Sequence, residues 1–370
     1  MKTEVDEVPV VVVGAGPAGL TAAITLARAG IETLVIERRS LPSDLPRATG
    51  ISTASMELLR SWGLEQQVRA GEMDVEWRAW AATSLAAAAS GQAVEVGFPS
   101  RAQSGILSPV ATSCAPQDHL EAVLEAHLRS LPAARLQRGV EVVGVGSGAE
   151  GVVVALRDGH AIRARYPAWG SRARSAGSAF LIGDAAHRVT PRGGTGMNSA
   201  IADAHDLGWK LGWVLNGWAP DDLLDTYEAE RRPVVAHNVE RSVDERGSYR
   251  DPTDEMHIDL GGRIQHLWVE TEEGRVSTLD LVGDGLTLFT GPDADTDAPT
   301  PTNGSAPLTV RALPAMTARA LRIAPGDPLL VRPSGVPARG RSTRFAREAA
   351  AQAPAALSTN AGRQAPTVCR

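Results

Sequence analysis

The first forty residues contain a strand, a glycine-rich loop, a helix and a second strand in immediate succession. Residues 8–13 are almost all valine, as expected for a strand that is buried on both faces. The sequence Gly-Ala-Gly-Pro-Ala-Gly follows at 14–19, and residues 20–29 have the pattern of a helix. A second apolar strand covers 33–36 and ends at Glu37. This βαβ arrangement predicts an α/β fold with a parallel sheet.

The glycine spacing in this loop is typical of dinucleotide binding. Gly14 permits a tight turn, Gly16 lets the backbone approach a pyrophosphate, and Gly19 lets the helix pack closely on the strand. The free N–H groups at the helix start can bind phosphate oxygens. Glu37 is placed to accept hydrogen bonds from an adenosine ribose. A purely structural turn is the alternative, and the motif alone does not distinguish NAD from FAD.

Composition and charge exclude several other classes of protein. The 370 residues allow two or three domains, and a net charge of -6 gives no basic footprint for nucleic acid. No apolar run is long enough to span a membrane, and the acidic start is unlike a secretory signal, so we expect a cytoplasmic protein. Cys114 and Cys369 lie far apart, and the histidines form no ligand-spaced pair. We therefore expect neither a disulfide scaffold nor a metal site.

The remaining pattern predicts further elements. Helices are expected at about 55–62, 117–131, 196–218 and 220–245. Strands are expected at 140–145, 152–156, 161–166, 180–182, 278–282 and 286–289. Residues 251–256 have the composition of a linker, and 291–307 that of a mobile loop.

Three segments resemble the p-hydroxybenzoate hydroxylase-like flavoprotein monooxygenases, which hydroxylate aromatic rings. They are the glycine loop with Glu37-Arg38, the stretch 45–64, and the stretch 180–198. The last contains Gly-Asp-Ala-Ala-His at 183–187 and ends in Gly-Gly-Thr-Gly-Met-Asn. The resemblance implies a Rossmann-like FAD-binding domain formed by residues 1–166 and 178–250.

The resemblance also implies which residues bind FAD. Asp184 is expected to bind the ribityl chain, because its carboxylate can accept hydrogen bonds from the ribityl hydroxyl groups. The helix start near Gly196 would place N–H donors and partial positive charge beside the flavin. Arg47 would counter the pyrophosphate charge, whereas Gln117 either contacts the cofactor or simply opens a helix. His187 is interpreted as a residue that positions its loop. The full predicted cofactor set is Gly14, Gly16, Pro17, Ala18, Gly19, Glu37, Arg38, Arg47, Gln117, Gly183, Asp184, Pro191, Gly194, Gly196, Met197 and Asn198, with no catalytic residue and no metal ligand.

The sequence departs from the family that it resembles between the strands expected at 161–166 and 180–182. Members of that family have a large middle segment there, including a β-sheet domain that covers the substrate. Only residues 167–179 occupy this place here, and thirteen residues reach at most ~45 Å and cannot bury a core. We therefore expect 167–177 to be a short linker where the substrate domain would be.

The C-terminal part resembles another known module. Residues 257–345 are similar to the thioredoxin-like domain of phenol and polyketide hydroxylases, but no CxxC is present, so dithiol chemistry is excluded. Residues 346–370 are rich in Ala, Pro and Gln, and we expect a disordered tail.

Three functions stay open. The first is an FAD-dependent monooxygenase that hydroxylates an aromatic polyketide or phenolic substrate with O₂, with NADPH as a transient reductant by resemblance alone. The second is a truncated FAD-binding protein without hydroxylase activity, at most an uncoupled NADPH oxidase. The third is a non-catalytic assembly module. The expected partner is an aromatic small molecule, with no nucleic acid and no membrane, and the sequence is compatible with a homodimer.

Overall fold

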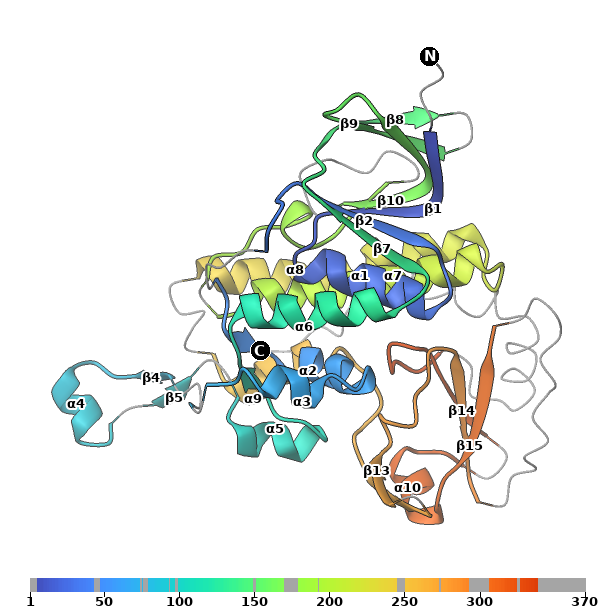
Figure 1. The fold of residues 1–370 in the computed structure, drawn as a ribbon. Coiled ribbons are helices and arrows are strands. Elements are labelled where there is room, and N and C mark those ends of the chain that lie inside the picture. Colours follow the sequence, from blue (N-terminus) through green and yellow to red (C-terminus); the bar gives the residue numbers. More distant parts are fainter. Residues whose placement is uncertain are drawn as a thin grey trace. The chain divides into compact units, whose positions relative to one another are not determined.

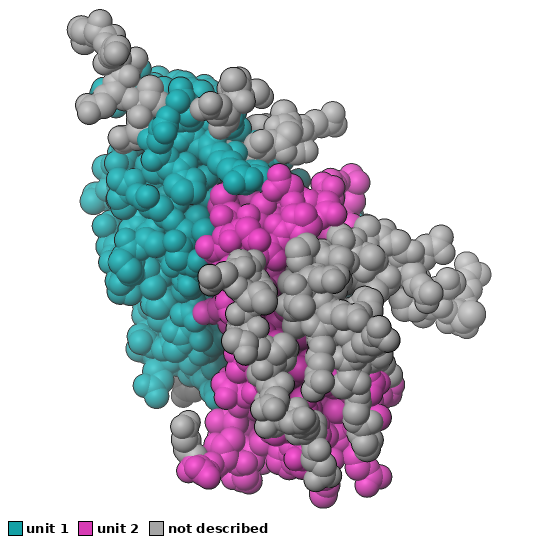
Figure 2. Space-filling model, turned by 90° about the vertical axis from the view of Figure 1, so that its right-hand side faces the viewer, with its two compact units in different colours: residues 1–208, 234–260 teal, residues 209–233, 261–370 magenta. Residues whose placement is uncertain are grey.

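The chain separates into two units. The computed structural model describes residues 5–42, 47–73, 75, 79–92, 94–96, 99–148, 151–169, 179–191, 193–244, 250–272, 274–292, 306–324 and 327–338. One unit comprises 1–208 with 234–260, and the other 209–233 with 261–370 (Figure 2). The division falls inside helices α7 (Gly196–Leu215) and α8 (Asp225–Val243), so each helix contributes residues to both units.

The larger unit is built on a seven-stranded sheet (Figure 1). Its order is β7-β2-β1-β10-β9-β8, and β11 also pairs with β10. The strands β7, β2, β1 and β10 are parallel, whereas β8, β9 and β10 form an antiparallel meander. The bounds are β1 Val5–Val13, β2 Thr33–Glu37, β7 Ala134–Arg138, β8 Val142–Gly148, β9 Gly151–Leu156, β10 Ala161–Trp169 and β11 Phe180–Leu181.

The strand β1 is central because its side chains can be buried on both faces of the sheet. Val10, Val11 and Val12 are fully buried, and the strand pairs in parallel with β2 on one side and β10 on the other. A run of β-branched residues suits this position. The predicted α/β fold with a parallel sheet is therefore confirmed.

Two long helices, α1 (Pro17–Arg28) and α6 (Gln117–Ser130), pack against each other beside the sheet (Figure 1). Helix α1 follows β1 in the chain. The buried residues Leu120, Leu124 and Leu128 give α6 its apolar stripe, as the sequence predicts. The smaller elements are β3 Gly50–Ile51, α2 Thr53–Ser61, α3 Glu65–Arg69, β4 Ala79–Ala81, α4 Leu85–Ala89, β5 Val94–Val96, α5 Arg101–Leu107, β6 Ser113–Cys114, the 3₁₀ turn η1 Gly183–Ala185, and α9 Pro252–Asp259.

Two of the predicted elements are wrong. The expected linker at 251–256 is a helix, α9, because Asp251 accepts hydrogen bonds from the N–H groups of Thr253 and Asp254. The expected strand at 278–282 is a turn, in which the Asp280 carboxylate accepts the N–H of Ser277. In both places a side-chain cap or turn determines the backbone, and hydrophobic pattern carries little information there.

The second unit has a smaller sheet of its own. The strands β14 (Leu286–Thr290) and β15 (Leu308–Ala312) are parallel, and β16 (Leu329–Val331) pairs antiparallel with β14. Phe289 is fully buried in its core. The other elements are the 3₁₀ helix η2 Asp221–Leu224, the hairpin β12 Trp268–Thr271 with β13 Gly274–Ser277, and α10 Ala315–Ala320. Residues 293–305 and the expected tail at 346–370 lie outside the described residues.

The strands β10 and β11 lie directly beside each other. Ala168 pairs with Phe180, and Trp169 with Leu181, in parallel. The strand β9 pairs with the first half of the same edge of β10. The two strands between which the resembling family has its middle domain are thus adjacent in one sheet. Across the described ranges, no helix is both long and apolar enough to cross a membrane.

Candidate functional site

The glycine loop joins β1 to α1 in a conformation that requires glycine. Gly14 has a φ of 108°, and its N–H donates to the Ile36 carbonyl at 2.7 Å. A Cβ on Gly19 would collide with the Gly14 carbonyl oxygen, so helix and loop can approach closely only without one. Helix α1 begins at Pro17, and its N-cap, Gly16, provides no side-chain hydrogen bond. The N–H groups of the first turn are therefore not capped by the preceding side chain, as an anion site requires.

Glu37 braces this loop from the end of β2. Its Oε2 accepts the N–H of Ala15 and its Oε1 accepts the N–H of Arg39, both at 2.9 Å. Each carboxylate oxygen keeps a second lone pair, so the group can still accept hydrogen bonds from a ligand. Glu37 thus fixes the shape of the loop as well as facing the cavity.

One cavity of about 980 Å³ brings the two predicted ends of the site together. Its wall includes the glycine loop on one side and the segment from Asp184 to Met197 on the other. The predicted residues that line it are Gly14, Gly16, Pro17, Ala18, Gly19, Glu37, Arg38, Arg47, Gln117, Asp184, Pro191, Gly194, Gly196 and Met197. Gly183 and Asn198 are not among the lining residues.

Asn198 has a different place, behind the cavity wall. Its Oδ1 accepts the N–H of Ser52 at 2.8 Å and the hydroxyl of Ser55 at 2.9 Å. Its Nδ2 donates to the carbonyls of Gly50 and Gly194, at 3.0 and 2.9 Å. The side chain therefore fastens the start of α7 to β3 and α2, and so holds the loop that carries Gly194.

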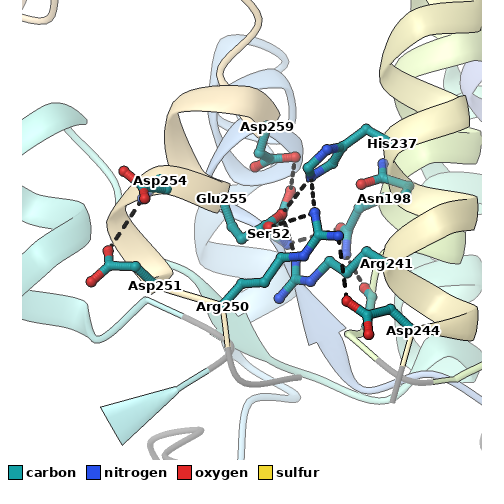
Figure 3. Close-up of polar contacts among 12 residues, drawn as sticks. Ser52, Asn198, His237, Arg241, Asp244, Arg250, Asp251, Asp254, Glu255 and Asp259 are labelled. Atoms are coloured by element: carbon teal, nitrogen blue, oxygen red, sulfur yellow. Dashed lines mark hydrogen bonds and ion pairs between the residues drawn. The ribbon is translucent and has the colours of Figure 1, made fainter. Parts of the chain in front are cut away.

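The helix that sequence analysis took for a linker supports the same wall. Glu255 on α9 receives Arg241 and His237 from α8, each at 3.0 Å (Figure 3). Arg241 in turn lies against the loop that precedes α7, since a Cβ on Gly193 would be 3.1 Å from its Nε. Asp259, at the end of α9, accepts the hydroxyl of Ser52. This buried polar cluster positions the backbone at 193–198 from the side away from the cavity.

The turn that carries Asp184 is tied to helix α7 by a neighbouring histidine. Gly183, which precedes it, has a φ of 58°, and its N–H faces Asp203 Oδ2 at 3.4 Å. The same oxygen is 2.6 Å from His187 Nε2. His187 thus ties the 183–187 turn to helix α7, in agreement with its interpretation as a positioning residue. Nowhere in the described ranges do three or more His, Cys, Asp or Glu side chains gather as they would around a metal ion.

The sequence analysis missed four charged residues of the wall, which are Arg39, Glu121, Arg138 and Glu141. Glu121 stands one helical turn beyond Gln117, so the i, i+4 spacing could have found it. Arg138 ends β7, a strand whose sequence Ala-Arg-Leu-Gln-Arg has too little apolar alternation to be recognised.

The surroundings of Glu121 perturb its pKa. Glu121 is 8% exposed, and Gln117 Nε2 donates to its Oε1 at 2.7 Å. Burial raises the pKa of Glu121, and the Gln117 hydrogen bond and the charges of Arg47 and Arg138 offset this only in part. The carboxylate of Glu37 raises the pKa further.

The donor set of this cavity fits FAD. An uncapped helix start with arginines nearby suits a pyrophosphate, and Glu37 suits a ribose. At the far end, Asp184 and the glycine-rich start of α7 offer an acceptor for hydroxyls and a close approach of backbone N–H groups. Together the fold and the cavity define a dinucleotide-binding flavoprotein.

The comparisons with known proteins agree with this class. The model of the FAD binding domain family matches residues 7–170 and 167–242. The chain therefore belongs to that family, and FAD is its cofactor.

Several relatives of the chain are named hydroxylases or monooxygenases. Tetracenomycin A2 monooxygenase-dioxygenase of Streptomyces glaucescens is 36% identical over 160 residues, which are 33% of this chain and 28% of that protein. Aklavinone 12-hydroxylase DnrF of Streptomyces peucetius is 24% identical over 451 aligned positions, covering 78% of this chain and 92% of that protein. The first match thus spans less than a third of its relative, and the second alignment is longer than this 370-residue chain.

A solved structure shows the same fold. The complex of aklavinone-11 hydroxylase with FAD and aklavinone has a TM-score of 0.76 and 23% identity, covering 93% of this chain and 98% of that one. At this identity the likeness concerns the fold alone.

Proposed function

We propose that the chain is an FAD-dependent monooxygenase that hydroxylates an aromatic polyketide or phenol, with NADPH as reductant and O₂ as co-substrate. The observation that carries the proposal is the single cavity that joins the glycine loop to the Asp184–Met197 segment. The names of the relatives, which are hydroxylases and monooxygenases of aromatic polyketides, support the substrate class. A cytoplasmic location and a homodimer remain predictions.

The chain's own residues would divide the cofactor between them. The start of α1 and Arg47 would hold the pyrophosphate, Glu37 the adenosine ribose, and Asp184 the ribityl chain. Bound FAD supplies the redox chemistry that activates O₂. The uncharged start of α7 would place N–H donors beside the flavin, where they stabilise negative charge on the reduced ring.

A second function is favoured by the direct pairing of β10 with β11. Too few residues lie between these paired strands to form a middle domain. The alignment with the Streptomyces peucetius enzyme covers more positions than this chain has residues, as expected if this chain lacks a segment of that enzyme. We therefore propose a FAD-binding domain of 1–166 and 178–250, a linker at 167–177 whose first three residues still belong to β10, and a thioredoxin-like domain at 257–345. Activated oxygen must be shielded from water to reach a substrate. Without a covering domain, the chain would act mainly as an uncoupled NADPH oxidase.

One experiment separates these functions. The purified chain is loaded with FAD, and NADPH consumption, hydrogen peroxide and hydroxylated product are measured together with polycyclic phenols as substrates. Product that matches the NADPH consumed supports the hydroxylase. Peroxide that matches it supports the oxidase. A colourless protein that binds no FAD at any concentration contradicts both and leaves the assembly module.

A further inference from the structure

Glu121 lies at the point where the glycine loop receives the cofactor. A Cβ on Gly16, which caps α1, would be 4.0 Å from Glu121 Oε1. Gly16 is the glycine of this loop whose missing side chain lets a pyrophosphate approach the backbone. The acidic side chain, carried by α6, therefore stands in the cavity wall beside the binding position of an anion.

The charges around Glu121 do not neutralise it. Among the described residues, no cation lies within ion-pair distance of its carboxyl group, and its hydrogen-bond partner, Gln117, is a neutral amide. Arg47 from the 47–49 segment and Arg138 from β7 act on it from farther away, while Glu37 from β2 repels it.

Arg138 is already engaged by another carboxylate. Its Nε and Nη2 both donate to Glu125 Oε2, one turn further along α6. The first turn of α1 carries no acidic residue, so no other charge of that helix start faces the site. A charged Glu121 would consequently meet a pyrophosphate with little compensation.

We propose that Glu121 takes up a proton when FAD binds, so that a neutral carboxyl group rather than a carboxylate faces the pyrophosphate. A neutral carboxyl can donate a hydrogen bond to a phosphate oxygen, whereas a carboxylate can only repel it. The inference rests on the proposed FAD site and adds a proton to its binding equilibrium. Glu121 is thereby a positioning and affinity-determining residue of the site.

The direction of the pH dependence follows from this coupling. Burial already raises the pKa of Glu121 in the free chain, and the phosphates would raise it further in the complex. Affinity for FAD is then full below the free-chain pKa and falls as pH rises between the free and bound values. In that interval the dissociation constant rises up to about tenfold per pH unit, because one proton is taken up per FAD.

The test measures proton uptake directly. FAD is titrated into the ligand-free chain by calorimetry between pH 5 and 9, in pairs of buffers with different ionisation enthalpies. The wild type is expected to bind up to about one proton per FAD at pH values between the free and bound pKa of Glu121, and progressively less on either side of that interval. Glu121→Gln, which keeps the shape and the partner of the side chain, should bind FAD without proton uptake and with a flat pH profile.

A matched control removes a carboxylate elsewhere. Glu65→Gln on α3 loses contacts to Arg60 and Arg69 but does not line the cavity, and it should retain the wild-type proton uptake. FAD binding by the wild type with no difference between buffers would overturn this inference alone. Absence of FAD binding by the wild type at every pH would overturn the proposed function and the inference with it.

Discussion

A buried and a partly buried glutamate show how the environment of a negative charge differs between the two units. In the first unit, the Gln117 amide is the one hydrogen-bond partner of Glu121 among the residues that the structure describes, and the pKa of Glu121 is raised. In the second unit, Glu230 accepts both terminal nitrogens of Arg332, at 2.7 and 3.1 Å, and Lys210 Nζ at 3.2 Å. Burial would raise the pKa of Glu230 too, but the hydrogen bonds and charges of Arg332 and Lys210 outweigh it and lower the pKa.

The difference indicates two roles for buried charge. Arg332 is 4% exposed and Lys210 fully buried, and the ring of Trp209 lies within 5.6 Å of both cationic groups. Every charge of this cluster finds its counterpart within the unit, as expected of a structural network. In the cavity of the first unit, no described cation forms an ion pair with Glu121, and Arg47 and Arg138 act on it only from farther away, which is the arrangement of a group that responds to a ligand.

The largest effect is expected from opening the closed cluster. Arg332→Met should lower the free energy of unfolding by about 3 kcal/mol, because it removes a buried arginine that holds the partly buried Glu230 carboxylate in a bidentate pair. Urea denaturation measures the change. Arg275→Met is the control, since that arginine is 59% exposed and stands 3.7 Å from an 82% exposed Glu270, and should cost less than about 1 kcal/mol. Equal losses in the two variants would show that the cluster contributes no special stability.

The next effect concerns the ligand side of the comparison. Glu37→Ala should weaken FAD binding by about 1–3 kcal/mol, because the ribose and the Ala15 N–H both lose an ionised acceptor. Quenching of flavin fluorescence on titration measures the affinity. Glu32→Ala, which removes an exposed carboxylate paired with Arg135, serves as the control and should leave affinity unchanged. An unaltered affinity in Glu37→Ala would mean that this carboxylate serves the loop alone.

A smaller effect should have opposite signs at the two glutamates. In the ligand-free chain at pH 8, Glu121→Gln should raise the free energy of unfolding by about 1 kcal/mol, since it removes a charge that burial disfavours. Glu230→Gln should lower it at the same pH, since it leaves Arg332 and Lys210 without their counter-charge. Thermal unfolding of the two variants tests this, and shifts of the same sign would contradict the comparison.

The smallest effect is the pH dependence of stability at each site. Glu230 has a lowered pKa in the folded state, so its contribution is present above about pH 4.5 and is lost as pH falls through the folded value. Glu121 has a raised pKa, so its contribution is present below about pH 4.5 and is lost as pH rises through the folded value. Each Gln variant should remove one of these slopes, by about 1 kcal/mol or less, from denaturation midpoints recorded between pH 3 and 8. If the pH dependence of stability stays the same in both variants, it arises from other titrating groups.

The sequence predicted the parts of the fold that depend on burial. The valine run of β1 and the leucines of α6 lie buried as their periodicity indicates. The strand β7 was not predicted, because its polar residues Arg135, Gln137 and Arg138 give no apolar pattern, and its register is set by pairing with β2. Helix α9 escaped because its start depends on the Asp251 cap and its fastening on polar contacts from other segments.

The site was predictable where backbone geometry demands particular residues. Gly14 and Gly19 follow from sterics, and Glu37 from its place after a strand. The sequence could not indicate that Asn198 turns away from the cavity, because three of its four partners, Gly50, Ser52 and Ser55, lie about 145 residues before it in the chain. Nor could it show that no described cation forms an ion pair with Glu121, because this depends on how the wall is assembled.

The adjacency of β10 and β11 makes the connection between them a suitable place to insert a domain. Ala168 and Phe180 are paired neighbours, so the two strand ends lie about 5 Å apart, as adjacent strands do. Domains whose termini lie close together can be inserted at such a place without altering the host sheet. A covering β-sheet domain could therefore be inserted between these two strands or exchanged for another. The cofactor-binding domain would stay the same while the substrate changes.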